Sequence, residues 1–80
     1  MKLTYDPRYN IAYIALRDKT VQVETVRISD ELNVDLAPDG TVYGIELLNA
    51  NEQLRTVDTG KLLVINATTG ERVELPLRAA

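Results

Sequence analysis

The sequence predicts an α+β domain that is mainly β: an antiparallel β-meander of about five strands with one short helix, followed by a C-terminal β-hairpin. Three observations favour this class. Apolar and polar residues alternate along several short segments, which is typical of half-buried strands. Residues that favour tight turns (Pro, Asn, Asp and Gly) separate those segments. A helical spacing of apolar residues follows only after residue 48.

The centre of the prediction is a strand–turn–strand unit. Residues 32–36 alternate apolar and polar side chains, and residues 43–47 do the same. Between them, Pro38 fixes φ at the first turn position, Asp39 bonds its own backbone, and Gly40 accepts a positive φ without steric cost. We therefore expect a tight antiparallel connection at this point.

Two further strands precede this unit, and a third leads into it. Residues 1–6 alternate, and residues 11–16 are apolar on both faces, as in a central strand that is covered on both sides. The polar residues 17–20 are predicted to form a hairpin loop into a strand over residues 21–28. The apolar phase slips within that strand, which predicts a β-bulge near Glu24-Thr25.

A short helix is predicted after the central unit. Asn49 and Glu52 have the spacing of a capping box, with Asn at the N-cap and Glu at N3. Gly60 is a plausible end for the helix. Because the chain enters the helix directly from the strand, we expect the helix to fold over the Ile45 face of the sheet. Its apolar stripe would consist of Ala50, Leu54 and Val57.

The C-terminal segment predicts one more hairpin. Residues 62–65 are apolar on both faces, and residues 66–70 form a loop that starts with an Asx turn and ends with a Gly suited to positive φ. Pro76 cannot donate a ladder hydrogen bond, so its strand should lie at an edge. We expect a single domain over residues 1–80, with the meander and helix in 1–60 and the hairpin in 61–77.

Composition disfavours several classes of function. The chain has 80 residues, a net charge of −3, and neither Cys nor His, so its side chains offer neither a zinc site nor His-based catalysis. Lys and Arg are scattered instead of forming a basic patch, which disfavours nucleic-acid binding. With no signal peptide and no long apolar segment, we expect a cytoplasmic protein with no membrane partner and no cofactor.

The candidate site residues are the carboxylates Asp35, Glu46 and Asp6. Two carboxylates in one cleft can do acid–base work or hold a hard cation. The simpler interpretation is that Asp6 and Asp39 form turns, while Asp35 and Glu46 are solvated on the face opposite the main apolar set. We therefore expect no catalytic, cofactor-binding or metal residue. Gly44, inside a strand, indicates either a close ligand or a packed neighbour such as the helix or a Tyr ring, and the packed neighbour is favoured.

Several short elements recur in order over residues 1–55: Tyr5-Asp6, Ala12-Tyr13-Ile14, Val34-Asp35, Asp39-Gly40 and Gly44–Ala50. Together they resemble the small bacterial family of domains of unknown function typified by YuzE. The family usually has Asp or another polar residue where Ile11 stands here, and the hairpin from residue 62 lies outside the resemblance. The resemblance implies a small soluble bacterial protein and carries over no catalytic residue.

The apolar residues exceed what one short helix can cover. Residues 11–16 and 62–65 are apolar on both faces, and large exposed apolar patches are uncommon on monomers. We therefore expect a non-enzymatic interaction module that self-associates as a homodimer. The alternative is an antitoxin-like partner of a small basic toxin-like protein, which rests on the net acidity and on the gene context that the resemblance implies. A small-molecule enzyme is the least favoured class.

Overall fold

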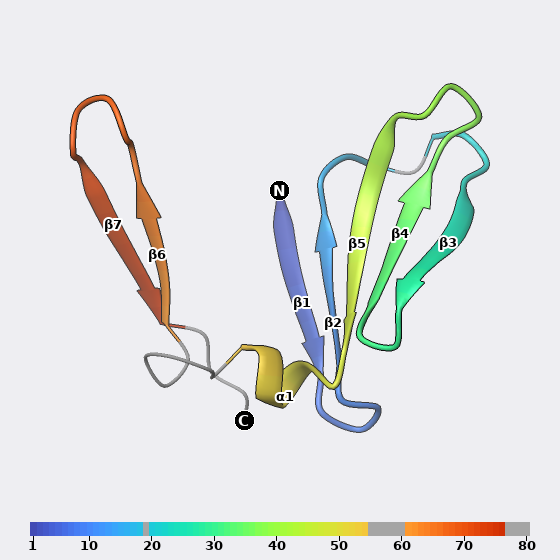
Figure 1. Cartoon of the computed structure of the whole chain (residues 1–80), viewed down its shortest axis with the longest axis horizontal. Coiled ribbons are helices and arrows are strands. Elements are labelled where there is room, and N and C mark those ends of the chain that lie inside the picture. The colour runs from blue at the N-terminus through green and yellow to red at the C-terminus, as the bar shows by residue number, and fades with distance from the viewer. Residues whose placement is uncertain (19, 55–60, 77–80) are drawn as a thin grey trace.

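The structure is a computed structural model that describes residues 1–18, 20–54 and 61–76. It confirms the predicted class, because the described chain is mostly strand with one short helix and a C-terminal hairpin (Figure 1). The elements are β1 (Lys2–Asp6), β2 (Ile11–Ala15), β3 (Glu24–Ser29), β4 (Leu32–Leu36), β5 (Val42–Leu48), α1 (Ala50–Gln53), β6 (Lys61–Ile65) and β7 (Arg72–Pro76).

Two blocks of strands build the main sheet. The hairpin β1–β2 and the meander β3–β4–β5 join through β5, which pairs with β2, so the order across the sheet is β1-β2-β5-β4-β3. The predicted hairpin between β2 and β3 is therefore wrong. Residues 16–18 and 20–23 lie between these strands, β3 is at the far edge of the sheet, and β5 takes the place beside β2. β6 and β7 pair only with each other, in a separate two-stranded sheet.

The register gives the main sheet one apolar and one polar face. Directly paired residues point to the same side, so the pairings carry a line of aliphatic side chains across every strand of the sheet. We call this line the aliphatic row: Leu3, Ile14, Ile45, Val34 and Val26. Tyr5, Ala12 and Leu47 lie on the same apolar face. The opposite, polar face carries Tyr13, Glu46, Asn33, Asp35 and Thr25.

The bulge predicted near Glu24 is wrong. β3 begins at Glu24, and its register against β4 shifts further along, between Arg27 and Ser29. Val21 and Val23 precede the strand, so they belong to the connection from β2 and not to the ladder. The change of apolar phase marks the start of β3, and no inserted residue is needed to explain it.

The predicted capping box is also wrong. Asn49 adopts a left-handed conformation (φ 52°, ψ 47°) and makes no side-chain cap, and α1 is only four residues long. Asn10 anchors the helix instead: its carbonyl oxygen accepts from the Ala50 amide at 3.0 Å, and its side-chain Oδ1 accepts from the Asn51 amide at 2.8 Å. These bonds fix α1 beside the β1–β2 turn, at the end of the sheet (Figure 1).

This position leaves the expected cover of the Ile45 face unformed. Ile45 is on the apolar face, as predicted, but a four-residue helix at the strand ends does not cover it. Of the predicted stripe, Ala50 is buried and Leu54 half-buried, whereas Val57, like the predicted helix end at Gly60, lies outside the described residues.

The turn predictions are confirmed. Asp39 Oδ1 accepts from the Thr41 amide at 2.9 Å, and Gly40 has φ +89°. In the C-terminal loop, Asn66 Oδ1 accepts from the Thr68 amide at 3.0 Å, and Gly70 has φ +79°. Pro76 ends β7, which is an edge strand because its sheet has two strands.

The core of the described chain is thin. Its buried apolar residues are Ala12, Ala37 and Ala50, and no larger side chain among the described residues is fully buried. Within the same residues, no helix is long and apolar enough to cross a membrane. The five strands of the sheet are therefore paired, but no other element among the described residues closes over its apolar face.

Candidate functional site

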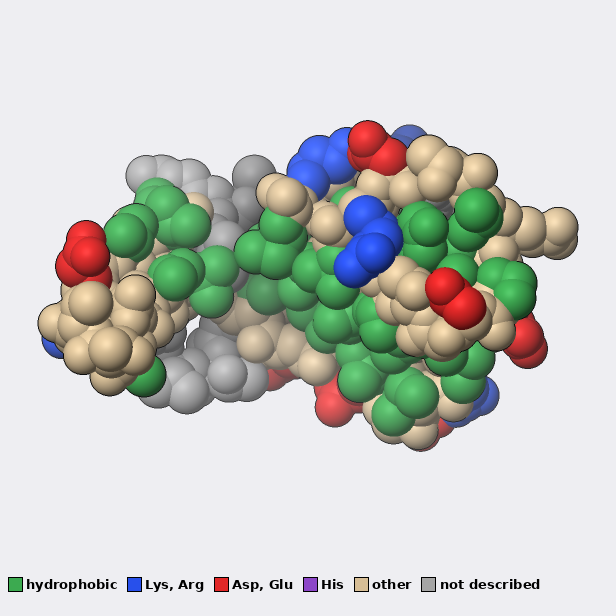
Figure 2. Space-filling model, turned by 90° about the horizontal axis from the view of Figure 1, so that it is seen from above, with side chains coloured by type: hydrophobic (Ala, Val, Ile, Leu, Met, Phe, Trp, Pro, Cys, Tyr) green, Lys and Arg blue, Asp and Glu red, His purple; other side chains and the backbone are tan. Residues whose placement is uncertain are grey.

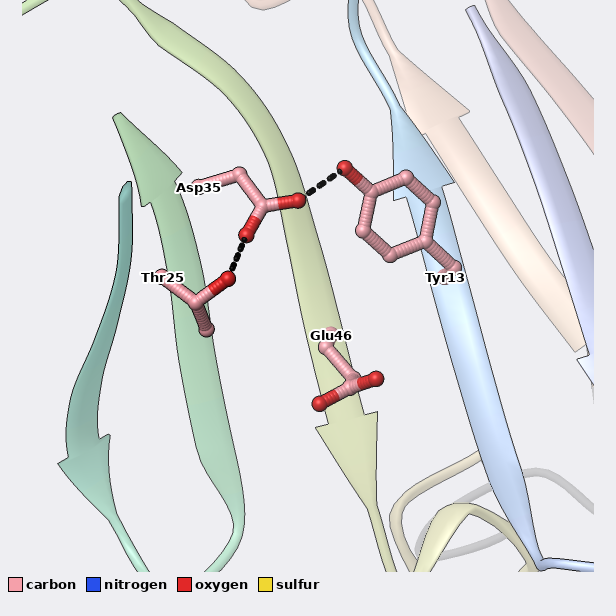
Figure 3. A pocket seen from close by; sticks show the side chains of 4 residues that line it. All are labelled: Tyr13, Thr25, Asp35 and Glu46. Carbon is pink, nitrogen blue, oxygen red and sulfur yellow. Dashed lines mark hydrogen bonds between the residues drawn. The ribbon is translucent and has the colours of Figure 1, made fainter. Parts of the chain in front are cut away.

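The polar face of the main sheet holds a cluster of side chains from four different strands. Tyr13 comes from β2, Glu46 from β5, Asp35 from β4 and Thr25 from β3 (Figure 3). The pairing of the strands explains why they meet: Thr25 lies directly opposite Asp35, and Asp35 lies opposite Gly44. Tyr13 is paired with Glu46 and reaches diagonally across Gly44.

Asp35 is the centre of this cluster. The Tyr13 hydroxyl donates to its Oδ2 at 2.6 Å, and the Thr25 hydroxyl donates to its Oδ1 at 2.7 Å. The residue is only 7% exposed. Hydroxyl donors on both oxygens satisfy a carboxylate that would otherwise be costly to bury. Asp35 therefore ties β2 and β3 to β4 through side chains.

Gly44 makes the Tyr13–Asp35 bond possible. A Cβ at position 44 would lie 1.9 Å from the Tyr13 hydroxyl oxygen and 2.3 Å from the carbon that carries it. No side chain larger than hydrogen leaves room for the ring in this place. The packed-neighbour interpretation of Gly44 is confirmed, and the neighbour is a Tyr ring.

Glu46 is held from the other side. Its Oε1 accepts from the Asn33 side-chain amide at 2.8 Å, between directly paired residues of β5 and β4. Asn33 Oδ1 is buried and has no hydrogen-bond partner among the described residues. The hydrogen bond between the two residues orients the Asn33 side-chain amide and holds the Glu46 carboxylate on the polar face beside Asp35.

Tyr13, Thr25, Asp35 and Glu46 line a pocket of about 310 Å³. Two of the four are carboxylates and none is basic, so the lining suits hydrogen-bond donors and cationic groups rather than anions. Among the described residues, no group of three or more His, Cys, Asp or Glu side chains is placed to hold a metal ion. Both carboxylate oxygens of Asp35 accept hydrogen bonds from side chains of other strands, which argues against a role for Asp35 as a general base.

The structure brings two of the three predicted candidates together. Asp35 and Glu46 share the pocket, whereas Asp6 lies at the end of β1, where its Oδ1 accepts from the Arg8 amide at 3.0 Å as predicted for a turn former. Asp39 is likewise confined to its turn. The expectation that Asp35 is solvated is wrong, because the Tyr13 and Thr25 hydroxyls permit its burial.

Asp6 also pairs with a cation. Arg8 NH2 lies 3.1 Å from Asp6 Oδ2. The hydrogen bond from the Arg8 side chain is the main cause that lowers the pKa of the Asp6 carboxyl below its ordinary value. Both groups are on the surface, so this pair fixes the β1–β2 turn and belongs to no pocket with Asp35.

Tyr13 and Thr25 were not predicted from the sequence as partners of Asp35. A signal was present in Gly44, because a Gly inside a strand next to a Tyr-bearing strand marks a place where a ring crosses the backbone. The pairing of β2 with β5 was needed to identify which Tyr fills that place. Thr25 reaches Asp35 because the register of β3 against β4 pairs the two residues directly.

The apolar face of the sheet is the second candidate site. All five members of the aliphatic row are half-buried, including Ile14 and Ile45 on the inner strands. Figure 2 shows hydrophobic side chains gathered over the five-stranded sheet and, separately, on the β6–β7 hairpin. An inner strand whose aliphatic side chains stay half-exposed lacks a covering layer.

Residues 2–51 match the family described as "Protein of unknown function (DUF2283)". The chain belongs to this family. The DUF2283 match spans β1 to β5 and the start of α1, so it coincides with the five-stranded sheet and leaves out the hairpin. No curated protein and no solved structure matches the chain. The likeness to YuzE and the antitoxin-like alternative stay predictions.

Proposed function

We propose that this DUF2283 chain is a non-enzymatic interaction module whose first partner is a second copy of itself, bound as a symmetric dimer through the apolar face of the five-stranded sheet. The observation that carries the proposal is the half-exposed aliphatic row. In a closed two-layer domain the inner-strand members Ile14 and Ile45 would be buried by the second layer.

The size of the exposed surface supports a protein partner. The chain has 6147 Å² of accessible surface, whereas a compact monomer of its mass exposes about 4,800 Å². Its radius of gyration is 14.0 Å, against about 11.6 Å for a compact domain of this length. The excess surface, roughly 1,300 Å², is larger than the about 800 Å² that each partner contributes to a standard protein–protein interface.

The chemistry of the two faces points to the apolar one as the interface. The aliphatic row carries no charge, whereas the polar face holds Asp35 and Glu46. A second copy brings exposed apolar surface of its own, and twofold closure is the commonest way for a protein to cover such a face. The Tyr13–Asp35–Thr25 bonds support this role, because they tie β2, β4 and the edge strand β3 in one register and so keep the apolar row aligned.

A pair of neighbouring substitutions on β1 tests the proposal. Leu3 is half-buried at one end of the aliphatic row, and the next residue, Thr4, is exposed on the polar face. We expect Leu3→Asp to abolish the dimer and Thr4→Asp to leave it intact, because only Leu3 would bring a charge into the interface. Light scattering after size-exclusion chromatography measures the mass, and circular dichroism verifies that both variants fold. Equal masses for the two folded variants would contradict the proposed interface.

A further inference from the structure

The β6–β7 hairpin carries a second uncovered apolar face. Leu62 is paired directly with Leu75, and Val64 with Val73, so all four side chains point to one side. They are 41%, 45%, 48% and 54% exposed in the order Leu62, Leu75, Val64, Val73. We call these four residues the hairpin apolar face.

The other side of the hairpin is chemically different. Lys61 Nζ lies 3.1 Å from Glu74 Oε1, and this ion pair is on the side away from Val64. The side away from Val64 thus mixes the charged Lys61, Glu74 and Arg72 with the apolar Leu63 and Ile65, whereas the hairpin apolar face carries only aliphatic side chains. A lone two-stranded hairpin is at best marginally stable in water, so its apolar side needs a surface to pack on.

The five-stranded sheet of the same chain does not provide that surface. The hairpin forms its own sheet and stands apart from β1 to β5 (Figure 1). Each chain therefore presents two complementary apolar surfaces, the hairpin apolar face and the aliphatic row, and both are partly exposed. Among the described residues, neither surface is covered by the other within one copy.

We propose that the two copies of the dimer exchange hairpins, so that the hairpin apolar face of each copy packs on the aliphatic row of the other. This inference rests on the proposed self-association and specifies what covers the row. A reciprocal exchange is closed by a twofold axis and uses both exposed surfaces of both chains at once. Both surfaces are aliphatic and uncharged, so packing them together leaves no polar group without a partner.

The areas agree with such an exchange. With 41–54% of each side chain exposed, the four residues leave roughly 300 Å² uncovered on each hairpin, and two reciprocal contacts would bury on the order of 1,200 Å², the lower limit for a specific interface. Two strands span about 10 Å and five strands about 24 Å. One hairpin therefore covers about half of the row rather than the whole of it.

Disulfide trapping tests the exchange directly, because the chain has no cysteine of its own. We would mix two full-length single-cysteine variants, Val64→Cys and a size-tagged Val34→Cys, and oxidise them. Val64 is on the hairpin apolar face, and Val34 is next to Ile45 in the aliphatic row. We expect a cross-link between chains of different size. Ile65→Cys is the matched control, because Ile65 is 55% exposed but lies on the other side of β6.

The outcomes separate this inference from the proposed function. A dimer in which Val34→Cys links to itself, or in which Ile65→Cys links as efficiently as Val64→Cys, would keep self-association and overturn the exchange. A disulfide within one chain of the double variant Val34→Cys/Val64→Cys, with the protein monomeric, would overturn both.

A second variant pair measures the contribution of the hairpin to the dimer without cross-linking. Val64→Asp should weaken dimerisation at least about tenfold in Kd, because it places a charge in an apolar contact, whereas Ile65→Asp should change Kd less than about threefold. Both positions are exposed in one copy, so neither substitution removes a buried group from the fold. Equal dissociation constants for the two variants would contradict the exchange.

Discussion

Gly44→Ala tests the link between the backbone of β5 and the buried carboxylate. The new Cβ would lie 1.9 Å from the Tyr13 hydroxyl oxygen, so the ring must move and its 2.6 Å bond to Asp35 must break. A hydrogen bond to a charged group contributes about 1.5–3 kcal/mol, and Ala in place of Gly returns about 0.5–1 kcal/mol. We expect a net loss of about 1–2 kcal/mol.

Urea unfolding at a fixed protein concentration measures this loss. With a slope of about 1 kcal/mol/M for a small protein, the midpoint should fall by about 1–2 M. Tyr13→Ala supplies the matched background, because it removes the ring that the new Cβ would meet. In that background Gly44→Ala should be neutral or stabilising, since Ala suits a strand better than Gly.

The comparison of the two backgrounds is decisive. If Gly44→Ala costs the same with and without the Tyr13 ring, the steric argument is wrong. An unchanged or higher midpoint for Gly44→Ala alone would show that the Tyr13–Asp35 bond does not depend on the missing side chain.

Three further predictions concern stability and titration. Ile45→Ala should lower the free energy of unfolding by about 1–3 kcal/mol, because it removes apolar contacts from the face that folding and association bury. Glu46→Ala should lower it less, and the urea midpoints of the two variants measure the difference. Arg8→Ala should raise the pKa of Asp6 toward its ordinary value of 3.8, as followed by NMR titration of the carboxyl group. Because folding lowers the pKa of Asp6, the Asp6–Arg8 pair stabilises the folded state at pH values above 3.8. This small contribution is lost as the pH falls through the folded-state pKa of Asp6. Gly40→Ala should cost about 1–2 kcal/mol in thermal or urea unfolding, since Gly40 has φ +89°.

The strands and turns were predictable because their signals are local. Alternation of side chains located β4 and β5, and the turn chemistry of Asp39 and Asn66 was visible in single residues. The same alternation placed Ile45 and Glu46 on opposite faces. Each of these predictions depends on neighbours within a few residues.

The order of the strands was not predictable in the same way. Alternation fixes which face a side chain takes, but not which strand lies next to it. The pairing of β2 with β5 joins Tyr13 to Glu46 across more than thirty residues of chain. Only that non-local pairing brings Tyr13 over Gly44 and beside Asp35, so the polar cluster could not be assembled from the sequence.

The helix illustrates competition between a local signal and tertiary contacts. Asn49 and Glu52 have capping-box spacing, yet Asn49 takes a left-handed conformation and the helix ends after Gln53. Asn10, distant in sequence, supplies the acceptors for the Ala50 and Asn51 amides. An isolated helix of this length has little stability of its own, so these contacts decide its position.

Sedimentation equilibrium of the unmodified chain at micromolar concentration measures self-association without any substitution. We expect a reversible monomer–dimer equilibrium that reaches twice the chain mass of 8.9 kDa, because the aliphatic row is half-exposed in one copy. A single species of 8.9 kDa across the accessible concentration range would contradict it.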